Sequence, residues 1–104
     1  MRPYKPLTPE AQLTRSIRSI LNAARICHWK NWGGLGSPPG LPDIVGCYKG
    51  RLFAIEVKAP HGKTSPAQDD FIARINEAGG LAFVAKDLDT VIDKLGLQDR
   101  FLIR

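Results

Sequence analysis

The feature that most constrains this chain is a two-residue connection between two strand-like runs. Residues 43–48 and 51–58 are rich in apolar and β-branched side chains, and only Lys49 and Gly50 separate the two runs. A connection of this length favours a tight antiparallel hairpin. The sequence therefore predicts both a hairpin and its register, with residue pairs counted outward from the turn.

Counting outward places Asp43 directly opposite Glu56. Opposed residues on an antiparallel pair have Cβ atoms about 4.5–5.5 Å apart, and like charges in such a pair are destabilising. Alternation along the strand also places Glu56 and Lys58 on one face, while the other face is wholly apolar and must pack on a helix. The residues of that apolar face are Phe53, Ile55 and Val57. An acidic pair and a lysine are thus expected to share one face of a sheet whose reverse side is core.

Two interpretations of this cluster are open. A hard divalent cation such as Mg²⁺ would offset the repulsion, because it binds oxygen ligands, typically one or two carboxylates together with water and substrate phosphate. Such a cation stabilises charge on a phosphodiester and lowers the pKa of a bound water, which Lys58 could position. Alternatively, Asp43 is merely a turn residue after Pro42, and Glu56 and Lys58 belong to a solvated strand face.

Periodicity along the rest of the chain predicts an α/β fold. Thr8 and Pro9 are typical of a helix start, residues 33–40 are typical of a loop, and Ser65 with Gln68 forms a capping box that opens a second helix. The expected elements, in chain order, are helix 9–23, strand 26–32, strand 43–48, strand 51–58, helix 65–78, strand 81–86 and helix 87–96. This α-β-β-β-α-β-α order predicts a small mixed β-sheet flanked by helices, with the fourth strand parallel to the third. Residues 97–104 could form an edge strand or an oligomer contact.

The length and composition predict one soluble, intracellular domain over residues 1–104. The chain has 104 residues, 43% of them hydrophobic, which suits one modest core. No apolar run approaches the roughly 18 residues that a membrane span needs, and the N-terminus lacks the apolar stretch of a secretory signal. We therefore expect no membrane partner, and a location in the cytoplasm of a bacterial host or at its nucleoid. Cys27 and Cys47 form no metal-binding or disulfide pattern and are expected to be small buried hydrophobes.

The excess of basic residues lies wholly in the first 42 residues. That segment has six Lys and Arg residues against Glu10 alone, whereas the remainder has nine basic and nine acidic residues, so the segment accounts for the net charge of +5. A basic surface of this kind suits a polyanion such as nucleic acid. The candidate nucleic-acid-binding residues are Arg15, Arg18, Lys30, Trp32 and Lys63. Either Trp29 or Trp32 could stack on an unpaired base, and the alternative is that both are core or dimer-interface residues.

Glu10 and Gln68 each have a structural explanation as well as a functional one. Glu10 lies in the first turn of its helix, where an acid is stabilising, and also at the end of the helix's apolar stripe rather than on its wet side. Gln68 completes the capping box with Ser65, and that role is sufficient to explain it.

Together these residues resemble the PD-(D/E)xK phosphodiesterase superfamily, and more narrowly the virus-type replication-repair nuclease (VRR-NUC) domain of the stand-alone type. The matching segments are Pro42-Asp43, Glu56-Val57-Lys58 and residues 62–68, with Glu10 in the N-terminal helix. The resemblance covers roughly residues 8–95. It implies a restriction-endonuclease-like core and a structure-specific DNA endonuclease that hydrolyses phosphodiester bonds with Mg²⁺ or Mn²⁺.

The resemblance also implies a role for each matched position. The implied catalytic residues are Glu10, Asp43, Glu56, Lys58 and Gln68. Asp43 and Glu56 would bind the metal together with the backbone carbonyl of Val57, and Glu10 would contribute through a metal-bound water. Lys58 would be the catalytic lysine.

Stand-alone members of this family resemble Holliday-junction resolvases and act as homodimers, so the resemblance implies a homodimer acting on branched DNA. The alternative is a non-cleaving nucleic-acid-binding module, or a nuclease subunit, with a nuclease-like fold. The presence of Asp43, Glu56 and Lys58 favours cleavage, because a domain relieved of catalysis has no physical reason to keep opposed carboxylates.

Overall fold

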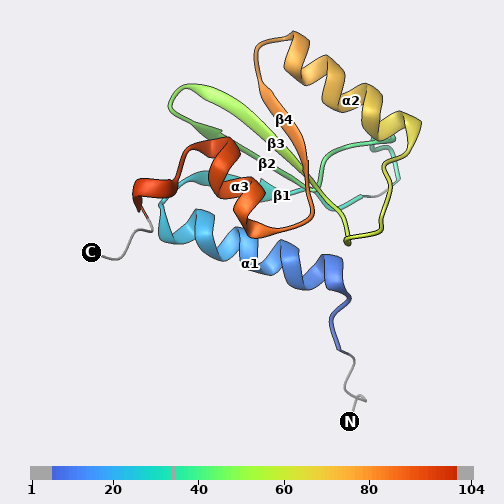
Figure 1. The fold of residues 1–104 in the computed structure, drawn as a ribbon. Coiled ribbons are helices and arrows are strands. Elements are labelled where there is room, and N and C mark those ends of the chain that lie inside the picture. The colour runs from blue at the N-terminus through green and yellow to red at the C-terminus, as the bar shows by residue number, and fades with distance from the viewer. Residues whose placement is uncertain (1–5, 34, 101–104) are drawn as a thin grey trace.

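The computed structural model describes residues 6–33 and 35–100, which form an α/β fold around a four-stranded mixed sheet in the order β1-β2-β3-β4 (Figure 1). Strands β1, β2 and β3 pair antiparallel, and β4 pairs parallel with β3. The elements are α1 (Pro9–Ala23), β1 (Cys27–Lys30), β2 (Ile44–Tyr48), β3 (Arg51–Val57), α2 (Pro66–Glu77), β4 (Leu81–Ala85), α3 (Leu88–Leu95) and a 3-10 turn, η1 (Gln98–Arg100). The fold class and the element order expected from the sequence are confirmed.

The hairpin between β2 and β3 has the predicted turn and register. Lys49 and Gly50 have φ values of 50° and 77°, the left-handed conformation that a two-residue hairpin turn requires at both positions. Pairing begins at Tyr48 with Arg51 and runs to Ile44 with Ile55. The next positions outward are Asp43 and Glu56, so the turn near one end of the hairpin sets the position of two carboxylates at the other.

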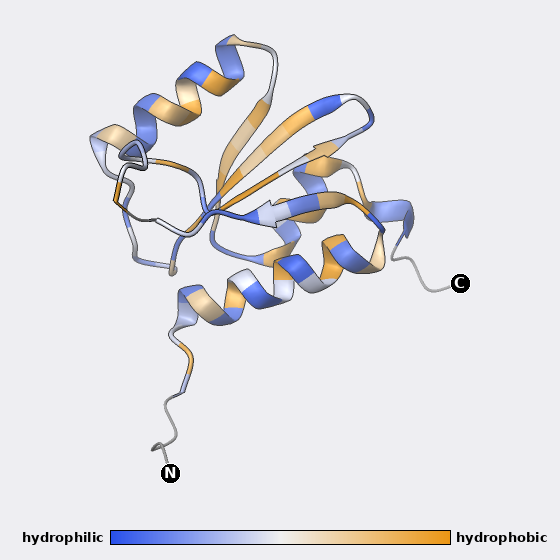
Figure 2. Ribbon diagram, turned by 180° about the vertical axis from the view of Figure 1, so that it is seen from behind, coloured by the Kyte–Doolittle hydropathy of each residue, from blue (hydrophilic) through white to orange (hydrophobic). Residues whose placement is uncertain are grey.

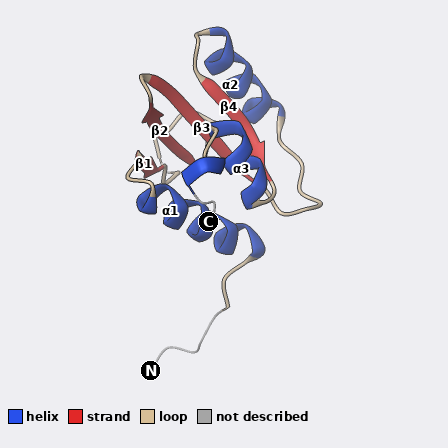
Figure 3. Ribbon diagram, turned by 60° about the vertical axis from the view of Figure 1, so that its left-hand side comes forward, coloured by secondary structure: helices blue, strands red, loops and turns tan. Residues whose placement is uncertain are grey.

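One face of the sheet carries the hydrophobic core, covered by α1 and α3 (Figures 1 and 3). Apolar residues at helical spacing supply the helical side of this core: Ile17 and Leu21 from α1, Val91 and Leu95 from α3. The alternating residues Phe53, Ile55 and Val57 supply the β3 side, as predicted. Figure 2 shows the central strands mostly in hydrophobic colours and the helices in mixed ones, as expected when each helix has one buried stripe.

The other face of the sheet is covered only in part. Helix α2 lies along β4 and the adjacent part of β3, and it has no fully buried residue of its own. Ala54, Glu56 and Ala82 are buried beneath α2. The sheet face that carries Glu56 is therefore covered here and is not open to solvent. Helix α2 does not extend over β1, where Trp29 is 48% exposed. Trp29 is thus not a core residue, which leaves base stacking or a dimer interface among the alternatives expected for it.

The same incomplete cover explains a second difference from expectation. Cys27 and Cys47 pair with each other across β1 and β2, and both are exposed rather than buried. Their side chains lie on the part of the sheet that α2 leaves uncovered. They are free cysteines.

The C-terminal segment is not an edge strand as far as the structure describes it. Leu97 is fully buried, and Gln98–Arg100 form the 3-10 turn η1. The Arg100 guanidinium donates to the carbonyl of Ala24, 3.1 Å away, which ties this segment to the end of α1. Residues 101–104, the rest of that prediction, lie outside the described residues.

Among the helices of the described chain, none is long and apolar enough to span a membrane.

Candidate active site

Asp43 lies between two strands and is held by both. On one side, the Asn31 backbone N–H donates to the Asp43 carbonyl (2.8 Å), and the Asn31 side-chain amide donates to the Pro42 carbonyl (2.8 Å). On the other side, the Val57 backbone N–H donates to Asp43 Oδ2 (2.8 Å). The carboxylate therefore has a fixed position beside the end of β3, which a simple turn residue would not need.

Glu56 is a buried carboxylate with one unsatisfied oxygen. Glu56 is only 3% exposed to solvent. Gln68 Nε2 donates to Oε1 (3.2 Å), whereas Oε2 is buried and has no hydrogen-bond partner among the described residues. A buried anionic oxygen without a partner is costly. The interpretation of Glu56 as part of a solvated strand face is wrong, because the start of α2 covers it.

The environment of Glu56 favours its neutral form. The pKa of Glu56 is raised from 4.5 to about 8, chiefly by burial and then by the adjacent carboxylate of Asp43. Lys58 lowers the pKa of Glu56, and Glu10 raises it, by smaller amounts. In the protein without a bound cation, burial and the neighbouring Asp43 charge thus favour a proton on Glu56. A cation placed between the two carboxylates would replace this proton.

Gln68 connects the second helix to Glu56. Its side-chain carbonyl accepts from the Ser65 backbone N–H (2.8 Å), and the Ser65 hydroxyl accepts from the Gln68 N–H (3.2 Å), which completes the predicted capping box. The cap directs the amide nitrogen of Gln68 toward Glu56. One residue therefore has both the structural role and the position near the carboxylates that the sequence suggested.

The loop before Asp43 packs against this same cap. Gly40 has a φ of 84°, and a Cβ there would clash with the backbone oxygen of Ala67, the residue before Gln68. Only a glycine allows the loop to approach α2 so closely.

Gly40→Ala is expected to destabilise the protein more than Gly36→Ala. Both glycines have left-handed backbones, but Gly36 (φ 89°) has no atom within 4 Å of a built Cβ. Gly36→Ala should cost about 1–2 kcal/mol through its φ alone. Gly40→Ala should cost about 1–3 kcal/mol more through the clash. Urea unfolding of both variants measures the difference, and equal losses would contradict the close approach.

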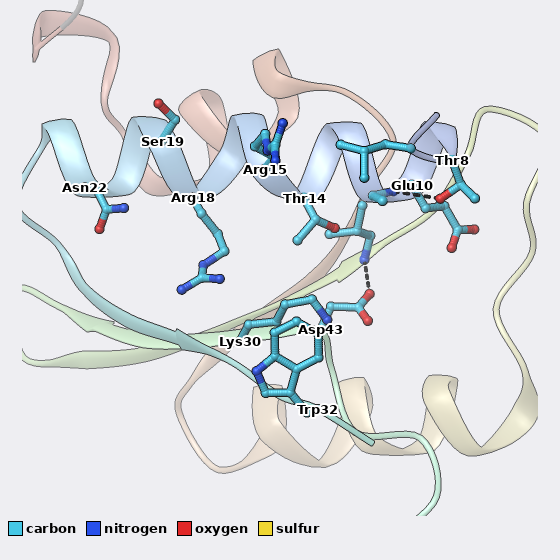
Figure 4. A pocket seen from close by; sticks show the side chains of 13 residues that line it. Thr8, Glu10, Thr14, Arg15, Arg18, Ser19, Asn22, Lys30, Trp32 and Asp43 are labelled. Atoms are coloured by element: carbon cyan, nitrogen blue, oxygen red, sulfur yellow. Dashed lines mark hydrogen bonds between the residues drawn. The ribbon is translucent and has the colours of Figure 1, made fainter. Parts of the chain in front are cut away.

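A groove of about 900 Å³ runs between α1 and β1 and ends at Asp43 (Figure 4). Its lining residues are Leu7, Thr8, Glu10, Ala11, Thr14, Arg15, Arg18, Ser19, Asn22, Lys30, Trp32, Asp43 and Val57. In Figure 4, Asn22 and Arg18 lie toward one end, and Asp43 and Glu10 toward the other. The acidic side chains of the groove thus lie toward one end, and Arg18 lies toward the other.

The groove brings together most of the residues that the sequence singled out. Seven of them line it: Glu10, Arg15, Arg18, Lys30, Trp32, Asp43 and Val57. Glu56, Lys58 and Gln68 do not line the groove, and Glu56 interacts with Asp43 from behind it. Lys63 is exposed on the loop between β3 and α2, apart from the groove.

Glu10 is placed differently from its expected position on the helix. It is exposed rather than part of the buried stripe of α1, yet it borders the groove near Asp43. Its Oε1 accepts from the Ala59 N–H at 3.4 Å, a long hydrogen bond that leaves the carboxylate free to interact with other groups.

The carboxylate oxygen atoms of Asp43 and Glu56 suit a hard divalent cation. Within residues 6–33 and 35–100, no group of three or more His, Cys, Asp and Glu side chains is arranged to hold a metal. Mg²⁺ does not require one, because it is commonly bound by one or two carboxylates and keeps several waters. The adjacent carboxylates of Asp43 and Glu56, with Oε2 of Glu56 unpartnered, fit such a site.

Comparison with known proteins identifies the family. The VRR-NUC domain family matches residues 6–87 of the chain. The chain belongs to the VRR-NUC family. A solved structure described as "VRR_NUC domain" is 24% identical, covers 88% of this chain and 98% of its own, and superposes with a TM-score of 0.71. A second, "VRR_NUC domain protein", is 22% identical over 86% of this chain and 85% of its own, with a TM-score of 0.65. No curated protein matches the sequence.

Membership of the VRR-NUC family makes this a nuclease-like domain. The VRR-NUC match spans α1 through β4 and includes Glu10, Asp43, Glu56, Lys58 and Gln68. The two structural neighbours support the fold that the sequence resemblance implied.

Proposed function

We propose that this VRR-NUC chain is a Mg²⁺- or Mn²⁺-dependent endodeoxyribonuclease that cuts branched DNA, such as Holliday junctions. The observation that carries the proposal is the buried, unpartnered Oε2 of Glu56 beside Asp43. An arrangement that costs stability in the free protein is accounted for if a cation occupies it.

In this proposal, Asp43, Glu56 and the Val57 carbonyl would hold the cation, and Glu10 would contribute through a metal-bound water. A bound Mg²⁺ or Mn²⁺ would stabilise negative charge on the phosphodiester and lower the pKa of the attacking water. Asp43 is held in place for this role by Asn31 and the Val57 N–H. Gln68 holds Glu56 by one oxygen and leaves the other available.

Lys58 supplies a positive charge next to the same carboxylates. It follows β3 directly, and its backbone N–H continues the ladder by donating to the Ala85 carbonyl (3.0 Å). Its charge lowers the pKa of Glu56, so the ammonium acts on the carboxylate cluster. A positioned ammonium stabilises the charge that develops on phosphate during hydrolysis and can orient the attacking water.

Basic residues along the groove would hold the DNA backbone. Arg15, Arg18 and Lys30 line it, and Lys63 would contact DNA from outside it. Neutralising two phosphate-binding residues, as in an Arg15→Gln, Arg18→Gln double variant, should reduce the slope of log affinity against log salt by about 1.4–1.8. Lys94→Gln, on the exposed face of α3, is the control. An unchanged slope in the double variant would place the DNA elsewhere.

A four-way junction needs two cuts, and one chain supplies one such site, so we also propose that the 104 residues act as one domain within a homodimer. Light scattering should give about twice the chain mass of 11.5 kDa. A mass of one chain would contradict the dimer.

The test of the proposed function is cleavage of linear, flap and four-way junction DNA. Wild type should cut branched DNA with Mg²⁺ or Mn²⁺ and stop when EDTA removes the cation. Lys58→Ala should cut about 100- to 1000-fold more slowly. Equal cutting by wild type and Lys58→Ala would contradict the role of Lys58, and junction binding without cutting would identify a binding module instead.

A further inference from the structure

The two tryptophans of the chain lie in different surroundings. Alternate residues of a strand point to opposite faces, so Trp29 and Lys30 face opposite sides of β1. Lys30 and Trp32 line the groove that ends at Asp43, whereas Trp29 lies on the open face that α2 leaves uncovered. Trp32 is 76% exposed, the higher value of the two. The structure thus separates two residues that sequence alone could not distinguish.

Trp32 is held by a cation while most of its surface stays open to solvent. The Lys30 ammonium is 4.2 Å from the centroid of its ring, a cation–π contact. Figure 4 shows Lys30 and Trp32 together on the wall opposite α1, next to Asp43. The exposed indole therefore presents open aromatic surface at the edge of the groove, where a planar ligand group could stack.

The basic residues across the groove also have unused binding capacity. Arg18 extends from α1 toward Lys30 and Trp32 (Figure 4), and its Nε is buried without a hydrogen-bond partner among the described residues. Among residues 6–33 and 35–100, the one ion pair joins Arg74 to Asp70. No acidic residue in these ranges therefore forms an ion pair with Arg18 or Lys30. Both cations are available to phosphates.

We propose that this groove holds a single-stranded DNA segment next to the cut, with one unpaired base stacked on Trp32 and the phosphates on Arg18 and Lys30. An aromatic platform within a basic groove is the arrangement that suits single strands, because every base has a π-face. A continuous duplex cannot use Trp32 in this way, since each of its bases is already stacked on both sides. This inference rests on the proposed nuclease function of Asp43, and it narrows the branched DNA to forms that have an unpaired segment at the branch, such as a flap.

Fluorescence isolates Trp32 in the test. The chain has two tryptophans, so Trp29→Phe leaves Trp32 as the sole one, and Trp32→Phe leaves Trp29. Each variant is titrated in EDTA, which prevents cutting, with a twelve-residue oligothymidylate, an abasic strand with the same phosphates, and a twelve-pair duplex. Trp32 should be quenched several-fold more by the oligothymidylate than by the other two ligands, while Trp29 should respond little. Equal quenching by the abasic strand or by the duplex would overturn the proposal.

Affinity provides the second measurement. Trp32→Ala should weaken oligothymidylate binding about 5- to 150-fold, the loss of one stacked base, while Trp29→Ala should change it less than about twofold. Trp32→Tyr keeps a stacking ring and should recover most of the affinity. Wild-type affinity in Trp32→Ala would overturn the proposal.

Because these measurements are made without a cation, they separate this inference from the proposed function. Selective quenching of Trp32 in a protein that cuts no DNA with Mg²⁺ or Mn²⁺ would support the strand-binding groove and contradict the nuclease. Cutting of branched DNA at wild-type rates by Trp32→Ala at subsaturating DNA would support the nuclease and overturn the stacking role.

Discussion

Asp43→Asn is expected to lower the rate of DNA cleavage by about 10²- to 10⁴-fold while the fold is kept. The amide oxygen of Asn can still accept from the Val57 N–H, so the contact that fixes this position at 2.8 Å is preserved. What is lost is the negative charge, and with it much of the affinity for a cation whose stabilisation of the transition state amounts to several kcal/mol.

The measurement for Asp43→Asn is single-turnover cleavage of a junction at saturating protein, so that binding differences do not contribute. Lys94→Ala, a charge change on α3 away from the groove, is the matched control and should cut at the wild-type rate. A cleavage rate for Asp43→Asn within threefold of wild type would remove Asp43 from the site.

Glu56→Gln is expected to change how stability depends on pH in the metal-free protein. The pKa of Glu56 is about 8 in the folded protein and 4.5 in an unperturbed chain, so folding takes up a proton between these pH values. The wild-type free energy of unfolding should therefore fall as the pH rises from about 4.5 to about 8, by up to about 1.4 kcal/mol per pH unit, and level off above that. Glu56→Gln carries no such proton and should lack this part of the dependence.

Urea unfolding in EDTA at pH 5, 6.5 and 8 measures this effect. The difference between wild type and Glu56→Gln is the quantity to compare, because titrating groups away from Glu56 contribute equally to both. The variant should become relatively more stable as the pH rises. Parallel pH profiles for the two proteins would show that Glu56 titrates normally and is not desolvated.

The hairpin is the part of the site that could be predicted from sequence. Lys49-Gly50 fixes the turn, the turn fixes the register, and the register brings Asp43 beside Glu56 whatever the rest of the chain does. The capping role of Gln68 was accessible for a similar reason, because a capping box is local and its position in the chain is set by Ser65. Interactions between residues close in sequence were sufficient to predict the hairpin register and the capping box.

Features that depend on how separate elements pack were not accessible. The burial of Glu56 depends on α2 lying over β3, and the exposure of Cys27 and Cys47 depends on α2 not reaching β1. Asn31 was missed altogether, because its contacts join β1 to Pro42 and Asp43 across an intervening loop. Asn31 follows β1 by one position, and continuing the register of β1 and β2 places it opposite Asp43. If the pairing of these strands had been known, it would have identified Asn31.

Direct binding of Mn²⁺ tests the proposal that Asp43 and Glu56 form one divalent-cation site. Electron paramagnetic resonance measures free Mn²⁺ during a titration with protein at pH 8, without DNA. Wild type and Lys94→Ala should remove Mn²⁺ from solution in a saturable way, whereas Asp43→Asn and Glu56→Gln should bind at least tenfold more weakly. Binding of Mn²⁺ by both carboxylate variants as tightly as by wild type would contradict the proposal.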